Sequence, residues 1–270
     1  MNIVVCVKYV PDATAERHFE PDNTVDRVGV DGLLCELDEY AVEQALRIKE
    51  TRSDPEETVV TVLTIGPELA ANAVRKALQM GADKGVHVMD EAIAGSDAPA
   101  TSLVLAEAIK KIEHDIVICG MASTDGSMGV VPAMLSERLG VPGLTLGSEI
   151  SVPDGEGGDG GDIVRIRRDG DVATETVEAT MPLVLSVTDQ SGEARYPSFK
   201  GIMAAKKKPV ETWSLADLGL EAGQVGLSVA WTVVEETAAR PPRSAGQVVK
   251  DEEGSGAKAL VDFLVSKKFI

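Results

Sequence analysis

The strongest constraint on the fold is a strand-then-helix pattern that occurs four times before residue 142. Four short apolar runs rich in β-branched residues are typical of strands buried on both faces. Each run is followed by a stretch with apolar residues at helical spacing, the first of which is capped by Asp38. Because parallel strands need a long crossover, usually a helix, the pattern predicts an α/β fold with a doubly wound, mostly parallel, Rossmann-like sheet. The expected strands are residues 3–10, 58–65, 84–89 and 115–120, and the expected helices begin at Asp38 and cover 67–80, 100–112 and 130–140.

After Pro142 the pattern changes to consecutive strands. Two of them alternate in period two around Asp169-Gly170-Asp171, which predicts a β-hairpin added to the α/β core. The strands expected here are residues 143–152, 162–170, 172–180 and 182–189.

Regular periodicity is lost from Ser191, and an arm containing Pro and Gly follows at 237–256. The arm has almost no core-forming residues, so we expect it to be disordered or laid along a partner. It ends in a predicted amphipathic helix at 257–269. We therefore expect three parts: a nucleotide-binding α/β domain (1–190), a recognition loop with its connection (191–234), and a C-terminal arm with a docking helix (235–270).

The charge balance excludes some classes of partner. The chain has 44 acidic and 26 basic side chains, a formal net charge of −18, which argues against nucleic acid or an anionic membrane. No apolar run reaches the ~18 residues needed to span a bilayer, and the start does not resemble a signal peptide, so we expect a cytoplasmic protein. The three cysteines have no CxxC spacing and the three histidines are scattered, which predicts reduced thiols and no metal site.

Sequence motifs for catalysis are missing. The pattern G-x-G-x-x-G occurs once, at 155–160, but acidic residues surround it and a strand follows it, so we interpret it as a solvated hairpin loop. There is no P-loop, no G-x-S-x-G, no H-E-x-x-H and no Cys–His pairing. We therefore predict no catalytic residues and a protein that is not an enzyme by itself.

The strongest candidate for a ligand site is the stretch CGMASTDGSMGVVP at residues 119–132. It follows the fourth predicted strand and leads into a helix, and ligands of open α/β sheets bind at that edge, where a helix N-terminus favours anions. The stretch contains no Lys or Arg, so backbone amides would have to recognise a phosphate. An ordinary βα loop without a ligand is the alternative.

A second candidate is the basic and apolar stretch YPSFKGIMAAKKKPV at residues 196–210. Together with Arg195 it contains five basic residues and no acidic one, in an acidic protein. Such a segment fits a partner with an acidic rim and an apolar pocket, the lysines steering the encounter. A solvated loop without a partner is the alternative.

Four stretches resemble the electron transfer flavoprotein beta subunit, in the same order as in that family. The resemblance covers nearly the whole chain and implies a heterodimer with an alpha subunit. In the family, one redox-active FAD lies mostly on the alpha side, and electrons pass from acyl-CoA and related dehydrogenases of fatty acid β-oxidation to a quinone reductase. The beta subunit commonly holds a structural AMP. The stretches are 38–50, 77–88, 164–189 and 193–210.

The resemblance also implies site residues. The AMP site would lie at the strand ends, and the family's recognition loop anchors partner dehydrogenases through an apolar side chain, for which Phe199 stands closest. The implied nucleotide-site residues are Cys6, Cys35, Glu36, Leu37, Asp38, Ile65, Gly120, Met121, Ala122, Ser123, Thr124, Asp125, Gly126, Ser127, Met128, Gly129, Val130 and Val131. The implied partner-binding residues are Tyr196, Phe199, Lys200, Ile202, Met203 and Lys206.

Two departures from the family leave the nucleotide open. The family often has an Asn-Pro-aromatic run where this chain has Cys35-Glu36-Leu37, and often a Gln where it has Val130. Members that bifurcate electrons hold a second FAD in this pocket, and the run Thr124-Asp125-Gly126-Ser127 is compatible with that form. We expect AMP, with the second FAD or a stand-alone nucleotide-binding regulatory module as alternatives.

Overall fold

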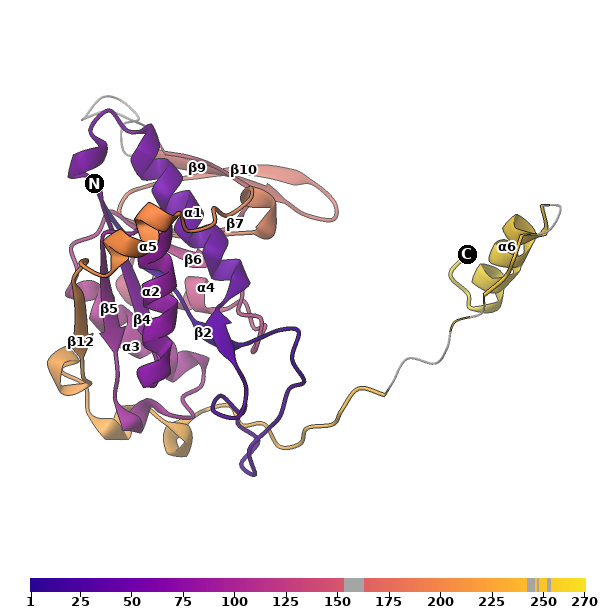
Figure 1. Cartoon of the computed structure of the whole chain (residues 1–270), viewed down its shortest axis with the longest axis horizontal. Coiled ribbons are helices and arrows are strands. Elements are labelled where there is room, and N and C mark those ends of the chain that lie inside the picture. Colours follow the sequence, from indigo (N-terminus) through magenta and orange to yellow (C-terminus); the bar gives the residue numbers. More distant parts are fainter. Residues whose placement is uncertain (153–162, 242–245, 247, 252–253) are drawn as a thin grey trace. The chain divides into compact units, whose positions relative to one another are not determined.

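The computed structural model describes residues 1–152, 163–241, 246, 248–251 and 254–270, and a seven-stranded sheet forms its centre (Figure 1). The strands are β1 (Asn2–Cys6), β4 (Val59–Ile65), β5 (Lys84–Val88), β6 (Ile116–Gly120), β7 (Gly143–Gly147), β11 (Leu183–Val187) and β12 (Val210–Trp213). Their order is β12-β5-β4-β1-β6-β11-β7, and all neighbouring pairs are parallel. The predicted doubly wound parallel sheet is therefore confirmed.

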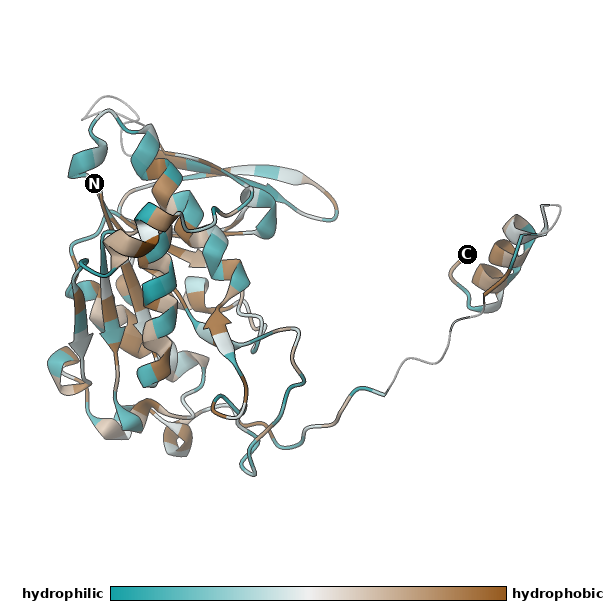
Figure 2. Ribbon diagram, viewed as in Figure 1, coloured by the Kyte–Doolittle hydropathy of each residue, from teal (hydrophilic) through white to brown (hydrophobic). Residues whose placement is uncertain are grey.

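Helices cover both faces of this sheet. Helices α1 (Glu36–Thr51) and α2 (Ala71–Met80) pack on one face, and α3 (Ala98–Lys110) and α4 (Val131–Leu139) pack on the other. Successive residues of β1 alternate between the two cores, Ile3 and Val5 in the first and Val4 in the second. The central strands are hydrophobic along their length, whereas the outward sides of α1 and α2 carry hydrophilic residues (Figure 2).

Two small sheets are added to the core. The predicted hairpin is confirmed, because β9 (Ile163–Asp169) and β10 (Thr174–Thr180) pair antiparallel, and β8 (Glu149–Ser151) joins them as a third strand. The second sheet pairs β2 (Tyr9–Pro11) with β3 (Gly32–Leu34). Short 3-10 helices connect the elements: η1 (Pro55–Glu57), η2 (Glu68–Ala70), η3 (Glu91–Ile93), η4 (Asp189–Ser191), η5 (Ala216–Leu218), η6 (Ala222–Gln224) and η7 (Leu227–Val229).

Two expected strands are divided in the structure. The run 3–10 leaves the central sheet after Cys6, because the Lys8 N–H bonds the Asp38 carboxyl, and the chain then pairs with β3. Residues 143–152 form β7 and β8 in two different sheets, with Leu146 in the left-handed region at φ 64°. Residues 182–189 enter the parallel sheet as β11, between β6 and β7.

The start of the first helix also differs from the prediction. Asp38 does not cap it: the N-cap is Cys35, and Asp38 lies inside the first turn, where it is buried. Its carboxyl accepts the backbone N–H of Lys8 from another segment, so it is not available to cap its own helix.

The stretch from Ser191 is more regular than predicted. It contains helix α5 (Phe199–Ala205), which Ser198 caps by accepting the Gly201 N–H, and the edge strand β12. Periodicity failed to show this helix because Ala205 is its one buried residue, so no apolar stripe is present to detect.

The chain divides into two compact units, Met1–Glu235 and Glu236–Ile270. The predicted C-terminal helix is present as α6 (Ser255–Ser266), and most of its large apolar side chains, including Leu260 and Phe263, are exposed. The arm at 237–256 is described only in part, and the G-x-G-x-x-G match at 155–160 lies outside the described residues. The expected three-part division stays a prediction.

Candidate functional site

The first candidate site lies at the carboxyl edge of the central sheet, where β1 and β6 end side by side. The N-terminus of α1 approaches this edge so closely that a Cβ on Gly120 would lie 2.5 Å from Asp38 Oδ1 and 2.8 Å from the Leu37 carbonyl oxygen. A residue with a side chain at position 120 would push α1 away. The glycine therefore brings the first turn of α1 next to the loop that follows β6.

We call residues 120–131 the nucleotide loop. Two of its amides are used within the loop, since Gly126 N–H bonds Asp125 Oδ1 at 2.7 Å and Ser127 N–H bonds the Ser123 carbonyl at 2.9 Å. The loop runs into α4, and no side chain of the described structure caps the N-terminus of that helix. Because Pro132 has no N–H and the Met134 N–H bonds the Val130 carbonyl, the N–H groups of Val131 and Ala133 are the ones that remain available to an anionic group.

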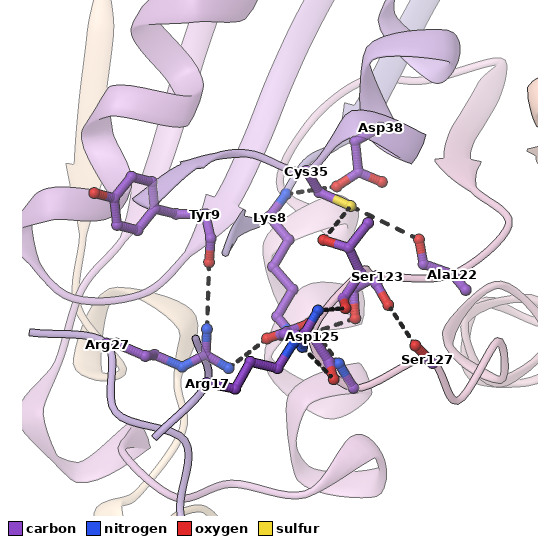
Figure 3. A network of polar contacts seen from close by, with 12 residues as sticks. Lys8, Tyr9, Arg17, Arg27, Cys35, Asp38, Ala122, Ser123, Asp125 and Ser127 are labelled. Atoms are coloured by element: carbon purple, nitrogen blue, oxygen red, sulfur yellow. Dashed lines mark hydrogen bonds and ion pairs between the residues drawn. The ribbon is translucent and has the colours of Figure 1, made fainter. Parts of the chain in front are cut away.

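Asp125 is the electrostatic centre of the nucleotide loop (Figure 3). Its side chain is 1% exposed, and Lys8 Nζ and an Arg27 Nη lie 2.9 Å and 2.5 Å from its oxygens. Burial works to raise the pKa of Asp125, but the Lys8 charge, hydrogen bonds from Ser123 and Lys8, and the Arg27 charge outweigh it and hold the pKa well below its ordinary value. Asp125 is therefore a carboxylate at neutral pH.

A third cation reaches the same loop from residues 12–31. The Arg17 guanidinium donates to the carbonyl oxygens of Thr124 and Asp125. Sequence reasoning missed Lys8, Arg17 and Arg27, because the loop itself contains no basic residue. The sequence placed Lys8 inside the expected strand 3–10, and only the observed end of β1 at Cys6 brings it to the edge of the sheet, whereas nothing in the sequence indicated the two arginines.

Asp38 faces the loop from the first turn of α1. Burial raises the pKa of its carboxyl to about 7, although hydrogen bonds from the Lys8 and Gly120 amides and the Lys8 charge oppose the shift. Asp38 and Asp125 thus differ: burial dominates the pKa of Asp38 and raises it, whereas nearby cations and hydrogen bonds dominate the pKa of Asp125 and lower it.

The three cysteines are buried and form no disulfide. Cys35 Sγ lies 3.9 Å from the Ala122 carbonyl oxygen and 4.0 Å from Thr124 Oγ1, so it contacts the nucleotide loop. Burial, followed by the nearby Asp38 carboxyl, raises the pKa of the Cys35 thiol, and a hydrogen bond with Cys6 and burial raise that of Cys119. The thiols of Cys35 and Cys119 are therefore protonated at neutral pH and poor nucleophiles.

Not all of the implied nucleotide-site residues gather at one place. Cys6, Cys35, Leu37, Asp38 and residues 120–127 meet at the edge of β1 and β6. Ile65 ends β4 one strand away and packs with the core that faces α3 and α4, as does Val131. Met128 is exposed, and Gly129 has a positive φ of 66° that favours glycine.

The second candidate site is the surface around α5, which is held on α1 by ion pairs. The Arg195 side chain bonds Glu43 at 2.6 Å and Glu50 at 2.9 Å, and Arg47 bonds Glu43 at 2.8 Å. The Glu43 side chain is 5% exposed. Burial alone would raise the pKa of Glu43. The hydrogen bonds from Arg195 and Arg47 outweigh burial and hold the pKa below its ordinary value. The backbone before α5 is also fixed, since Gln44 and Arg47 donate to the carbonyl oxygens of Ser191 and Glu193.

Helix α5 is fixed on its other side by α2. A Cβ on Gly201 would lie 2.4 Å from the Gln79 carbonyl oxygen, so only glycine permits this approach. Lys208 Nζ donates to the carbonyl oxygens of Leu78 and Gly81 at the C-terminus of α2. Two of the five basic residues of the stretch, Arg195 and Lys208, are therefore used inside the fold.

The outward surface of α5 presents apolar groups to solvent. Tyr196 is 91% and Phe199 80% exposed, and Ile202 and Met203 are exposed beside them. Lys200, Lys206 and Lys207 are exposed around this patch. We call Tyr196, Phe199, Ile202 and Met203 the apolar patch. All the implied partner-binding residues thus lie on or next to one short helix.

The described residues contain neither a membrane-spanning helix nor a cluster of metal ligands. No helix among them is long and apolar enough to cross a membrane. Within the same residues, no three His, Cys, Asp or Glu side chains gather as a metal-binding group.

Known proteins resemble this chain over its whole length. Residues 22–218 match the family described as the electron transfer flavoprotein domain. The chain is 46% identical to an electron transfer flavoprotein subunit beta of Mycobacterium tuberculosis (strain ATCC 25618 / H37Rv), an alignment that covers 100% of this chain and 99% of that one. It is 34% identical to the subunit of the same name from Megasphaera elsdenii (99% and 97% covered) and 32% identical to the caffeyl-CoA reductase-Etf complex subunit CarD of Acetobacterium woodii (99% and 97% covered).

Proposed function

Because this chain belongs to the electron transfer flavoprotein family and matches its beta subunits from end to end, we propose that it is an electron-carrier subunit and not an enzyme by itself. It pairs with an alpha subunit, and the heterodimer takes electrons from acyl-CoA and other flavin dehydrogenases and passes them to a quinone reductase. The FAD of the heterodimer, held mainly by the alpha subunit, supplies the redox chemistry. The three buried free thiols suit a reducing compartment, the cytoplasm.

The observation that carries the docking role is the fixed apolar patch on α5. Exposed apolar side chains that lie together on a protein surface are typical of an interaction site. Here the ion pairs of Arg195 and the close contact between α5 and α2 fix the segment that bears these side chains. A preorganised patch loses little entropy when a partner covers it. We assign Phe199 as the anchor residue because it projects from the first turn of the helix and is 80% exposed.

We further propose that the nucleotide loop holds AMP as a structural group. The residues fit an adenylate phosphate in three respects: an uncapped α4 N-terminus, small residues at Gly126 and Gly129, and basic side chains at the loop. The protein's own part would be to bind and orient the nucleotide at the junction of α1, β6 and α4.

The electron-bifurcating form with a second FAD in this subunit is the second candidate. It is favoured by the run Thr124-Asp125-Gly126-Ser127 and by the relative named as part of a caffeyl-CoA reductase-Etf complex. A stand-alone nucleotide-binding regulatory module is the third, and it would need neither the arm nor the apolar patch.

Co-expression tests the proposed function. With a candidate alpha subunit, the chain should co-purify as a yellow complex with equal amounts of the two subunits, and an acyl-CoA dehydrogenase with its substrate should bleach the flavin. A colourless, stable monomer would contradict the carrier role and favour the regulatory module. A yellow complex that no flavin dehydrogenase reduces would leave the heterodimer but contradict the proposed donors.

A further inference from the structure

Three basic side chains converge on a loop that has none of its own (Figure 3). Lys8 comes from the connection after β1, and Arg17 and Arg27 come from residues 12–31, about a hundred residues before the loop they contact. Lys8 and Arg27 bind the Asp125 carboxylate, and Arg17 binds two backbone carbonyls.

More cationic than anionic side chains contact the loop. Lys8, Arg17 and Arg27 meet it, and Asp125, held as a carboxylate, is the acidic side chain that ion-pairs with them among the described residues. Asp38 contacts the Lys8 backbone, and burial raises the pKa of its carboxyl to about 7. The side chains that touch the loop are therefore mainly cationic, which favours an anionic group there.

The cations also retain unused donors. A guanidinium group has five N–H donors in a planar fork. Arg17 uses Nη1 and Nη2 for two carbonyls, and Arg27 uses its Nη atoms for Asp125 and the Tyr9 carbonyl. The Lys8 and Arg27 side chains are 42% and 32% exposed. Each can donate to a phosphate oxygen while its present contacts to the protein stay in place.

We propose that Arg17 and Arg27, with Lys8, recognise the phosphate of the nucleotide bound at this loop, so that the site selects a 5′-phosphorylated adenosine over adenosine. Asp125 is then the internal carboxylate that fixes Lys8 and Arg27 in position rather than a ligand of the nucleotide. This assignment rests on the proposed nucleotide site and identifies the phosphate as the group that the site recognises. Phosphate recognition comes from side chains of residues 8–27 as well as from backbone amides.

Binding calorimetry on the full chain, freed of nucleotide by dialysis at high salt, tests the proposal. The probes are AMP, adenosine and FAD, and the variants are Arg17→Gln and Arg27→Gln. Because a charge-assisted hydrogen bond contributes more than a neutral one, each variant should bind AMP about 10-fold more weakly or worse, and adenosine as the unaltered chain does. The matched control is Arg75→Gln, an exposed arginine on α2 that bonds Asn72 and should leave all affinities unchanged.

The outcomes separate this proposal from the proposed function. If the unaltered chain binds AMP and both variants bind it within twofold, phosphate recognition by these arginines is wrong and the nucleotide site stands. If the unaltered chain binds neither AMP nor FAD, both proposals are wrong. If the unaltered chain binds FAD instead of AMP, and the variants bind FAD more weakly, the arginines still recognise phosphate. That result favours the electron-bifurcating form. Arg17 is exposed, so its variant should fold, and equal thermal unfolding midpoints without nucleotide verify this.

Discussion

Asp125 and Glu43 are two buried carboxylates that organise the nucleotide loop and the segment leading into helix α5. Each carboxylate forms ion pairs with two basic side chains. Asp125 pairs with Lys8 and Arg27, and Glu43 pairs with Arg47 and Arg195. In each case one cation belongs to a segment without regular structure, which the ion pair fixes to the scaffold. The same device therefore shapes both candidate sites.

The two regions differ in what remains free. Around Glu43 the charges satisfy one another, since Arg195 divides its donors between Glu43 and Glu50, and the surface left exposed is the apolar patch with the lysines beside it. Around Asp125 the arginines keep unused donors, and the side chains that contact the loop are mainly cationic. The network at Glu43, in which the charges are paired, thus supports a surface suited to a protein partner. The network at Asp125, in which donors remain unused, supports a site suited to an anion.

The largest expected effect comes from breaking the network at Glu43. Glu43→Ala removes a buried carboxylate and leaves Arg47 and Arg195 without their common partner, so the free energy of unfolding should fall by about 3 kcal/mol. Urea denaturation of the full chain measures it. Glu50→Ala, at the exposed end of the same network, should cost less than about 1 kcal/mol. Equal losses for the two variants would show that Glu43 is not the centre of the network.

The apolar patch should matter for function rather than stability. Phe199→Ala removes the proposed anchor, and electron uptake from a dehydrogenase should slow about 10- to 100-fold at limiting concentration, while flavin content stays unchanged. Val172→Ala, a fully exposed apolar residue in the turn between β9 and β10, is the matched control. Uptake that is the same for both variants would remove Phe199 from the docking role.

The two carboxylates of the nucleotide site predict opposite pH effects. Asp38 has a folded-state pKa of about 7 against an ordinary value of 3.8, so the folded chain binds more protons in that interval, and the contribution of Asp38 to stability falls as pH rises from about 4 to 7. The lowered pKa of Asp125 gives a contribution that is lost only as pH falls below about 4.

Asp38→Asn isolates this effect. The amide oxygen can still accept the Lys8 N–H but no longer ionises, so the variant should be more stable than the unaltered chain at pH 8, on the order of 2 kcal/mol, and equally stable near pH 4. Urea denaturation at several pH values is the measurement, with the exposed Asp22→Asn as the control. A constant difference across this pH range would contradict the assignment.

The smallest expected effect concerns the lysines beside α5. The exposed Lys206 and Lys207 should steer a partner, so replacing both by Gln should lower the association rate a few-fold at low ionic strength and little at high salt. Lys208→Gln should leave the rate unchanged and instead lower stability by about 1 kcal/mol, because Lys208 Nζ bonds two carbonyls of α2. Stopped-flow reduction by a dehydrogenase separates the two, and a rate loss in Lys208→Gln alone would reverse the assignment.

The sequence predicted those parts of the fold that bury apolar side chains. The β-branched runs of β4, β5 and β6 and the hairpin of β9 and β10 were recognisable because burial imposes a pattern. Helix α5 and strand β12 were missed because most of their residues are exposed, so burial imposes no hydrophobic pattern on their sequence. The break between β1 and β2 depends on Asp38, thirty residues after Lys8.

The candidate sites show the same limit. The place of residues 120–131 at the carboxyl edge of the sheet was predictable because they follow a buried strand and lead into a helix, whereas nucleotide binding there stays a prediction. The cations at this loop were not predictable, since Arg17 and Arg27 lie 108 and 98 residues from Asp125 along the chain and in a segment without periodicity. Charge counting along the sequence also overstated the basic character around α5, because Arg195 and Lys208 are used within the fold.

Native mass spectrometry of the purified complex measures its subunits and bound cofactors in one experiment. We predict one copy of this chain with one alpha subunit, one FAD and one AMP, and the loss of AMP alone in the Arg17→Gln, Arg27→Gln double variant. A complex with two FAD molecules and no AMP would contradict the structural AMP. A mass equal to this chain alone, after co-expression with its alpha subunit, would contradict the claim that it is half of an electron carrier.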